Sequence, residues 1–321
     1  MTLLNVTNLT ISFNTPDGYI KAVNQLNLKL NPGEALGIVG ESGSGKTQLV
    51  LGIMGLLASN SNVSGSVKFH NTELIGLSQK ALNKIRGNKI SIVFQDPMTA
   101  LNPYLKISTQ MIEVLKYHKN MNYKEAKNEA LKMLDLVKIS DAKNRIDMYP
   151  HEFSGGMRQR VLIAMSLLCK PDILIADEPT TALDVTVQAQ IVNLLKELKQ
   201  ELGSAIIIIT HDLGVVAGIC NQVMVMYAGN IIERGPVNHI FYTPKHPYTK
   251  ALLRSIPNLK SENYDNLPTI TGHPPNLLQL PKGCSFADRC EFVMDICKNH
   301  MPPLNNISEQ IQNACFLELS K

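Results

Sequence analysis

Hydrophobic and polar residues alternate along much of the first 30 residues. Leu4 and Val6 are separated by a polar residue, and so are Leu26 and Leu28. A period of two is typical of strands with one face in the core and the other in solvent. The region therefore predicts antiparallel strands, and a further strand is predicted at Gly65–His70.

After this region, short apolar runs alternate with segments of helical spacing. Ala205–Thr210 is almost entirely β-branched, whereas Val187–Leu202 has the spacing of an amphipathic helix. Strands that alternate with helices predict a largely parallel sheet covered on both faces. Strands are predicted at Ala35–Val39, Lys89–Gln95, Ile173–Ala176 and Ala205–Thr210, helices at Val161–Cys169 and Val187–Leu202, and a hairpin around Ala228-Gly229-Asn230.

Two changes of character divide the chain. Pro97, Pro103 and Pro150 bracket a segment whose centre, Lys124–Val137, has helical spacing, which predicts a helical insertion between two strands of the main sheet. From about residue 236 the sequence becomes rich in proline and asparagine and loses its periodicity. We predict a main domain over residues 1–235, with a helical subdomain over about 97–165, and an irregular C-terminal extension over residues 236–321.

Composition narrows the functional class. The 321-residue chain carries 31 Lys and Arg against 27 Asp and Glu, a net charge of +4, without a long basic run. That bias is too weak to indicate nucleic-acid binding. No apolar run approaches the roughly 18 residues of a membrane-spanning helix, and the N-terminus lacks the layout of a secretory signal. These features predict a cytosolic protein that, if it works at a membrane, docks there on another subunit.

The segment Gly40–Thr47 (G-E-S-G-S-G-K-T) fits the phosphate-loop pattern G-x-x-x-x-G-K-[ST]. It follows a predicted buried strand and precedes an apolar helical stretch, which is the context that the motif requires. Backbone N–H groups of such a loop and the positive end of the next helix form a cradle for an anion. Its members would be Gly40, Ser42, Gly43, Ser44 and Gly45, with Lys46 on the β- and γ-phosphates and the Thr47 hydroxyl on Mg²⁺. The loop predicts binding of a nucleoside triphosphate.

Residues suited to hydrolysis follow two of the predicted strands. Asp177 and Glu178 come directly after Ile173–Ala176, so Asp177 is placed to hold Mg²⁺ through water and Glu178 to act as general base. His211 follows Ala205–Thr210, where its imidazole is placed to hydrogen-bond the γ-phosphate. Together with the phosphate loop, these residues predict an enzyme that hydrolyses the nucleotide.

A second anion site is predicted at residues 153–160 (F-S-G-G-M-R-Q-R), where a serine and two glycines precede a helix. One phosphate loop and two anion sites in a chain are best explained by a symmetric or pseudo-symmetric dimer. Each second site would then cap the γ-phosphate held by the partner. The segment from Thr181 to Asp184 would lie at the seam of this dimer.

The ordered set of Gly40–Thr47, Gln95, Ser154–Met157, Asp177-Glu178, Asp184 and His211 resembles the ATP-binding-cassette (ABC) family, over roughly residues 1–255. Within it, the chain is similar to the ATPase subunits of bacterial oligopeptide and dipeptide importers. Phe153 and Met157 depart from the commoner Leu and Gln of the signature, and they match that subgroup. The resemblance implies an α/β P-loop ATPase fold with a mixed sheet core, an antiparallel β subdomain, a helical subdomain and a small irregular C-terminal extension.

The resemblance also implies roles for individual residues. Ser154, Gly155, Gly156 and Met157 form the signature that faces the partner's ATP. Gln95 contacts Mg²⁺ and the attacking water, and the segment after it forms the groove that receives a helix of the membrane subunit. The metal ligands would be Thr47, Gln95 and Asp177. Phe13 would stack on the adenine, with Tyr19 as the alternative.

The six cysteines fall into two groups. Cys169 and Cys220 lie in apolar context, which predicts buried, inert thiols. The other four form the pattern C-x₅-C-x₆-C-x₁₇-C in irregular chain, where a cytosolic setting disfavours disulfides. Zinc usually takes shorter spacings and an iron–sulfur cluster accepts wider ones, so a [4Fe–4S] cluster, zinc and free thiols all stay open. The four residues are Cys284, Cys290, Cys297 and Cys315.

The C-terminal stretch strengthens the subgroup assignment. Residues 283–304 and the run His246-Pro247-Tyr248-Thr249 resemble the C-terminal extension of peptide-importer ATPases, some of which hold an iron–sulfur cluster there. Such a cluster would have a structural role, bracing the extension.

We therefore expect the ATP-hydrolysing subunit of a bacterial importer for oligopeptides or dipeptides, at the cytoplasmic face of the cell membrane. Its partners would be a second ATPase subunit, for which the resemblance favours a paralogue, two membrane permeases and an extracytoplasmic solute-binding protein, without nucleic acid. One alternative is the same role for nickel chelates or another small solute. Another is a soluble cassette ATPase acting on DNA or ribosomes, but the chain lacks a second cassette and long coiled coils.

Overall fold

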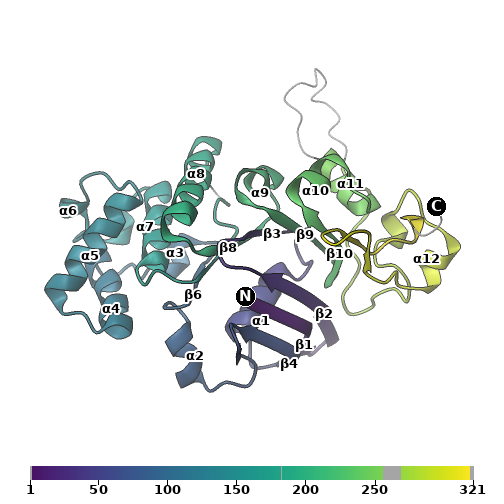
Figure 1. Cartoon of the computed structure of the whole chain (residues 1–321), viewed down its shortest axis with the longest axis horizontal. Coiled ribbons are helices and arrows are strands. Elements are labelled where there is room, and N and C mark those ends of the chain that lie inside the picture. Colours follow the sequence, from purple (N-terminus) through teal and green to yellow (C-terminus); the bar gives the residue numbers. More distant parts are fainter. Residues whose placement is uncertain (1, 182, 256–268, 319–321) are drawn as a thin grey trace. The chain divides into compact units, whose positions relative to one another are not determined.

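The computed structural model describes residues 2–181, 183–255 and 269–318 (Figure 1). The chain forms two compact units. The helical unit comprises Leu30–Ala35 and Gly76–Ile209, and the P-loop unit comprises Thr2–Lys29, Leu36–Ile75 and Thr210–Lys321. We describe each unit by itself.

An antiparallel sheet fills the N-terminal part of the P-loop unit. Its strands are β1 (Leu4–Thr15), β2 (Gly18–Leu30), β4 (Ser61–Phe69) and β5 (Thr72–Glu73), in the order β2-β1-β4-β5. The register of β1 and β4 pairs Leu4 with Phe69 and Phe13 with Ser61. Leu4 and Val6 are buried before an irregularity between Thr7 and Thr10, and Leu9 and Ile11 are buried after it. On each side of the irregularity, alternate residues of β1 face the core, as predicted.

A second group of strands carries the phosphate loop. β3 (Ala35–Val39) runs parallel to β9 (Gln222–Tyr227), and β9 forms an antiparallel hairpin with β10 (Asn230–Pro236). Ala228 and Gly229 form its turn with φ of 46° and 78°, the backbone that a tight hairpin between right-twisted strands requires. The mixed sheet and the hairpin are both confirmed. The helices beside it are α1 (Lys46–Met54) and α9 (Leu213–Ile219).

The C-terminal residues join this sheet directly. β12 (Gln312–Asn313) pairs antiparallel with β10, and β11 (Asn305–Asn306) pairs with β12. The buried Glu233 of β10 accepts hydrogen bonds from the backbone N–H groups of Lys245 and His246 at 2.6 and 3.1 Å. The helices of this region are α10 (Val237–Tyr242), α11 (Pro247–Arg254) and α12 (Asp295–Asn299).

Three of the described strands of the helical unit run parallel. β7 (Ile173–Asp177) lies between β6 (Ile90–Val93) and β8 (Ala205–Thr210), with Ile173 paired to both Ile90 and Ala205. Two of them, β7 and β8, are buried along their whole length. Figure 1 shows the helical insertion as the group of α4, α5 and α6. The helices of the unit are α2 (Gln79–Ile85), α3 (Pro97–Ala100), α4 (Ile107–Lys119), α5 (Tyr123–Leu136), α6 (Ala142–Arg145), α7 (Gly155–Leu167) and α8 (Val185–Leu202).

Two local predictions differ from the structure. The segment after Gln95, whose prolines predict a shaped loop, begins with the short helix α3, because the Asp96 side chain accepts from the Met98 N–H at 2.8 Å and caps it. Helix α7 starts at Gly155 instead of Val161, since the cap at Ser154 offsets the poor helix propensity of the two glycines. Among the described residues, no helix has the length and apolar character to span a bilayer.

Candidate nucleotide site

The phosphate loop joins β3 to α1, with Lys46 as the first helical residue. Gly40 and Gly45 have φ of 154° and 99°. A Cβ atom would lie 2.2 Å from the Met226 carbonyl oxygen at Gly40 and 2.2 Å from the Ala22 carbonyl oxygen at Gly45. These two glycines let neighbouring backbone approach the loop, so the loop is held closely against β2 and β9.

The Lys46 ammonium lies inside the loop with a side chain that is almost fully buried. It donates to the carbonyl oxygens of Gly40 and Glu41 at 2.7 and 2.8 Å and to Ser44 Oγ at 3.3 Å. The Gly229 N–H of the β9–β10 turn donates to the Ser44 carbonyl oxygen at 3.0 Å. A buried cation at the start of a helix, within a loop of turned backbone, fits the binding of a polyphosphate anion.

In the helical unit, the end of β7 brings Glu178 and Gln95 together. The Glu178 Oε2 atom accepts from Gln95 Nε2 and from Thr181 Oγ1, each at 2.8 Å. Glu178 has φ of 47°, a left-handed backbone that costs a non-glycine residue about 1–3 kcal/mol. Its N–H donates to the Ile209 carbonyl oxygen at 2.8 Å. The carboxylate is therefore held by its backbone and by two donors, directly after the buried Asp177.

The segment around Ser154 forms the N-terminus of α7. The Ser154 Oγ accepts from the Met157 N–H at 3.4 Å, which caps the helix. A Cβ at Gly156 would lie 2.7 Å from Val187 Cγ1 of α8, so a glycine is needed where the two helices meet. Asp184 caps α8 through a 2.9 Å hydrogen bond from the Val187 N–H. Both predicted dimer elements are thus helix starts packed around Val187.

The other predicted site residues lie on or next to β1, β2, β8 and α1. His211 directly follows β8, and Thr47 lies in the first turn of α1. Phe13 on β1 is half-buried, whereas Tyr19 on β2 is 51% exposed. In the seam segment, Thr181, Leu183 and Asp184 are described and Ala182 lies outside the described residues.

The chain matches two family models. The ABC transporter family matches residues 23–181, and the oligopeptide/dipeptide transporter C-terminal region matches residues 232–297. The oligopeptide transport ATP-binding protein OppD of Salmonella typhimurium is 57% identical over 314 residues, which cover 98% of this chain and 93% of that protein. This chain belongs to the ABC transporter family. Haemophilus influenzae OppD is 58% identical over 99% of this chain and 98% of that protein, and the dipeptide transport ATP-binding protein DppD of Bacillus subtilis is 49% identical over 98% and 95%.

Solved ABC cassettes share the fold. The dimeric post-hydrolysis structure of the cassette MJ0796, bound to ADP and Pi, superposes with a TM-score of 0.66 at 30% identity, over 73% of this chain and 98% of that one. Clostridium perfringens CbiO1, part of the transporter complex CbiONQ, gives a TM-score of 0.64 at 32% identity, over 75% and 91%. The predicted α/β P-loop ATPase fold is confirmed.

The cysteines of this ABC protein lie as two groups. Cys169 and Cys220 are buried, as predicted. The four C-terminal cysteines line one small cavity together with His246 and Phe286. Burial raises the pKa of the Cys284 thiol to about 11. Within the described residues, no group of three or more His, Cys, Asp or Glu side chains is arranged to hold a metal ion, so neither the iron–sulfur nor the zinc prediction gains support.

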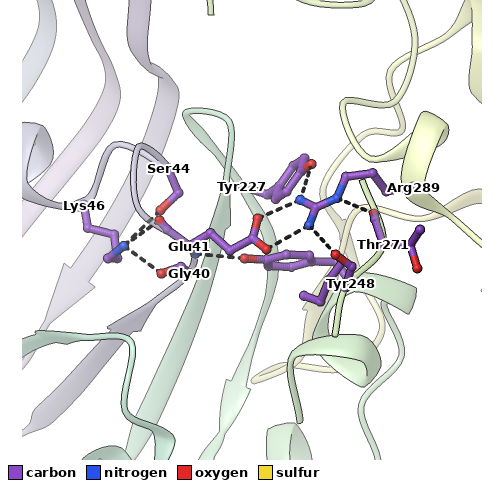
Figure 2. Close-up of polar contacts among 9 residues, drawn as sticks. Gly40, Glu41, Ser44, Lys46, Tyr227, Tyr248, Thr271 and Arg289 are labelled. Carbon is purple, nitrogen blue, oxygen red and sulfur yellow. Dashed lines mark hydrogen bonds and ion pairs between the residues drawn. The ribbon is translucent and has the colours of Figure 1, made fainter. Parts of the chain in front are cut away.

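Sequence reasoning missed one set of contacts at the phosphate loop. Glu41, a variable position of the loop motif, forms an ion pair with Arg289 and a backbone hydrogen bond with the Tyr248 hydroxyl (Figure 2). The H-P-Y-T run resembles a family feature, but no local pattern links it to Glu41. Glu41 and Arg289 are 248 positions apart in sequence, so no periodic signal could reveal the pair.

Proposed function

We propose that this chain is the ATP-hydrolysing subunit of a bacterial importer for oligopeptides or dipeptides. The observation that carries the proposal is the Gln95–Glu178 hydrogen bond. It occurs in a chain that has a phosphate loop and is 57–58% identical to oligopeptide transport ATP-binding proteins over almost its whole length. ABC ATPases act on ATP with Mg²⁺, and the buried Lys46 inside the loop fits the triphosphate.

The chemistry assigns each residue a part. Lys46 and the backbone N–H groups from Gly40 to Thr47 bind and orient the phosphates. Glu178, oriented by Gln95 and Thr181, takes the proton of the attacking water as general base, and His211 hydrogen-bonds the γ-phosphate. The adenine stacks on Phe13 or on the more exposed Tyr19.

The proposed ligands of the metal are all oxygen donors. The donors would be the Thr47 hydroxyl, the Gln95 amide oxygen and, through water, Asp177, all oxygen ligands that suit Mg²⁺. When bound, the ion neutralises charge on the phosphates.

The nucleotide-hydrolysing form is a dimer in which Ser154, Gly155, Gly156 and Met157 cap the γ-phosphate of the ATP held by the partner. Support comes from the capped N-terminus of α7, whose backbone N–H groups suit an anion. The related cassette MJ0796 is a dimer bound to ADP and Pi. Asp184 lies at the seam, and the second subunit is a paralogue.

A groove in the helical unit serves as the docking site for a membrane subunit. A cavity of about 510 Å³ is lined by side chains from the segment after β6 and from α4 and α7. Phe94 and Met98 in this region are 40% and 59% exposed, although both are apolar. An apolar groove of this size suits a short helix of a permease. The complex would contain two permeases and an extracytoplasmic solute-binding protein, would place this chain at the cytoplasmic face of the membrane and would involve no nucleic acid.

The C-terminal part adds a module to the cassette. We place the cassette at residues 1–235, its helical subdomain at about 97–165 and the extension at 236–321. The thiols of Cys284, Cys290, Cys297 and Cys315, which line one cavity, are the residues that would hold a [4Fe–4S] cluster. Iron and visible absorbance in protein purified anaerobically test this assignment, and colourless, iron-free material would refute it.

The function is tested by peptide uptake in the source bacterium. Deletion of the gene should abolish uptake of a labelled tripeptide and leave uptake of the free amino acids unchanged. The wild-type chain should restore uptake, whereas Glu178→Gln should not. Normal tripeptide uptake in the deletion strain would exclude peptides as the cargo.

A further inference from the structure

The C-terminal extension contacts the phosphate loop at Glu41 through an ion pair and a hydrogen bond (Figure 2). Arg289 Nη1 lies 2.7 Å from Glu41 Oε2, and Arg289 Nη2 lies 2.9 Å from Glu41 Oε1. The Arg289 side chain is 5% exposed and that of Glu41 is 24% exposed. A bidentate ion pair of this kind fixes the orientation of both side chains as well as their distance, unlike a surface ion pair between mobile side chains.

Arg289 is itself held on every side. Its Nε donates to the Thr271 carbonyl oxygen at 3.0 Å, and its Nη2 donates to the Ile270 carbonyl oxygen at 3.3 Å. Its Nη1 also donates to the Tyr227 hydroxyl at 3.1 Å. The hydrogen bonds from Arg289 to Glu41 raise the pKa of this guanidinium. Two backbone carbonyls of the extension and the Tyr227 hydroxyl of β9 thus fix the orientation in which Arg289 reaches Glu41.

Tyr248 holds the backbone of the same residue. Its fully buried hydroxyl accepts from the Glu41 N–H at 2.9 Å. Its ring lies with a centroid distance of 4.6 Å from Tyr227 and 5.3 Å from Phe286. At the start of α11, His246 Nδ1 accepts from the Tyr248 N–H at 3.1 Å. The H-P-Y-T run thus holds Tyr248 in the position from which its hydroxyl contacts the phosphate loop.

Glu41 passes this constraint to the nucleotide-binding groups. Its carbonyl oxygen accepts from Lys46 Nζ at 2.8 Å and from the Ser44 N–H at 3.2 Å. The extension therefore fixes the positions of the Glu41 side chain and N–H. The carbonyl oxygen of the same residue in turn positions the Lys46 ammonium. The extension also borders the loop at a second place, because Pro274 and Pro275 line a small pocket together with Ser42, Gly43 and Ser44.

We propose that Arg289 and Tyr248 are positioning residues through which the C-terminal extension holds the phosphate loop in its ATP-binding form. The proposal deepens the ATP site and rests on the proposed function of that loop. Neither residue touches the reacting atoms. Their loss should weaken ATP binding and leave turnover at saturating ATP nearly unchanged, because the general base and its donors lie elsewhere in the chain.

The test is a double-mutant cycle on the purified full-length chain, with a fluorescent ATP analogue as ligand and the thermal midpoint as a measure of folding. Arg289→Met and Glu41→Gln should each raise the dissociation constant about tenfold, as expected for loss of a charged hydrogen-bonded pair. The double variant should be no worse than either single variant, since both remove the same contact. Tyr248→Phe, which keeps the ring, should raise the dissociation constant by about threefold or more.

Arg254→Ala is the matched control. Arg254 is an exposed arginine of the same extension, paired with the exposed Glu291 at 3.4 Å, so its removal should not change ATP binding. If Arg289→Met does not fold, Glu41→Gln and Tyr248→Phe decide, because both keep the shape of the side chain. A lowered thermal midpoint with an unchanged dissociation constant would show that the contact only anchors the extension, and would overturn the proposal. Lys46→Ala distinguishes failure of this proposal from failure of the proposed ATP site. Normal ATP binding by that variant would refute the role of the phosphate loop in binding ATP.

Discussion

Gln95 donates a hydrogen bond to Glu178 over 2.8 Å, between the residues that follow the adjacent parallel strands β6 and β7. The two residues are 83 positions apart in sequence. Since Thr181 donates to the same carboxylate oxygen, the carboxylate has one defined direction. This relationship underlies the first prediction.

Replacement of Glu178 by Gln should remove hydrolysis and keep ATP binding. The amide keeps the size of the side chain and can still accept a hydrogen bond, but it cannot take a proton from water. We expect turnover to fall by about 100-fold or more, as for loss of a general base, with a trapped ATP-bound dimer. ATPase assays and size-exclusion chromatography with ATP measure both effects. Glu197→Gln, at an exposed carboxylate of the same unit paired with Lys138, is the control. Wild-type turnover of Glu178→Gln would refute its role as base.

Two glycines of the phosphate loop should respond differently to alanine. Gly45 and Gly43 both have positive φ, which costs alanine ~1–2 kcal/mol. Only at Gly45 would the added methyl meet backbone, 2.2 Å from the Ala22 carbonyl oxygen, whereas nothing lies within 4 Å at Gly43. Gly45→Ala should therefore lower the free energy of unfolding by clearly more than Gly43→Ala, as measured by urea denaturation. Equal losses would contradict this packing.

Acid should destabilise the chain through His246. Burial lowers the pKa of this imidazole to about 3 from 6.5. In the unfolded chain His246 therefore binds a proton below pH 6.5, whereas in the folded chain it binds one only below about pH 3. The neutral imidazole contributes fully to the free energy of unfolding above pH 6.5. This contribution is lost as the pH falls toward 3, at up to about 1.4 kcal/mol per pH unit.

His246→Asn keeps a side-chain acceptor at the start of α11 and removes the titrating group. Its urea midpoint should fall less between pH 7 and pH 5 than that of the wild-type chain. His151→Asn, at an exposed histidine, should retain the wild-type pH dependence. Parallel pH curves for wild type and His246→Asn would contradict the assignment.

A charge in the groove of the helical unit should separate ATPase activity from membrane docking. Phe94 lines the cavity, so Phe94→Asp places a carboxylate where an apolar helix would bind. We expect loss of co-purification with the permeases from detergent, while the ATPase activity of the isolated chain is kept. Tyr117→Asp is the control, because Tyr117 is 66% exposed on α4 and does not line the cavity. Unimpaired co-purification of Phe94→Asp would exclude this groove as the docking site.

Elements with a strong period or a dedicated motif were predictable. The strands β7 and β8 are short apolar runs and were predicted within one residue at each end. The helix α5 was predicted from apolar positions that the structure buries at Ala126, Ala130 and Leu134. The start of α7 was missed because two glycines hide a helix whose first turn depends on the Ser154 cap.

The amino-acid sequence by itself determined the nucleotide chemistry of this protein, since the phosphate loop and the acidic pair after β7 act through residues that are neighbours in the chain. Only the tertiary structure decided what holds these groups in place. Arg289 reaches Glu41 across 248 positions, and Gln95 reaches Glu178 across 83. Such pairs form because folded strands and loops bring distant side chains within hydrogen-bond distance, and no spacing along the chain encodes that distance.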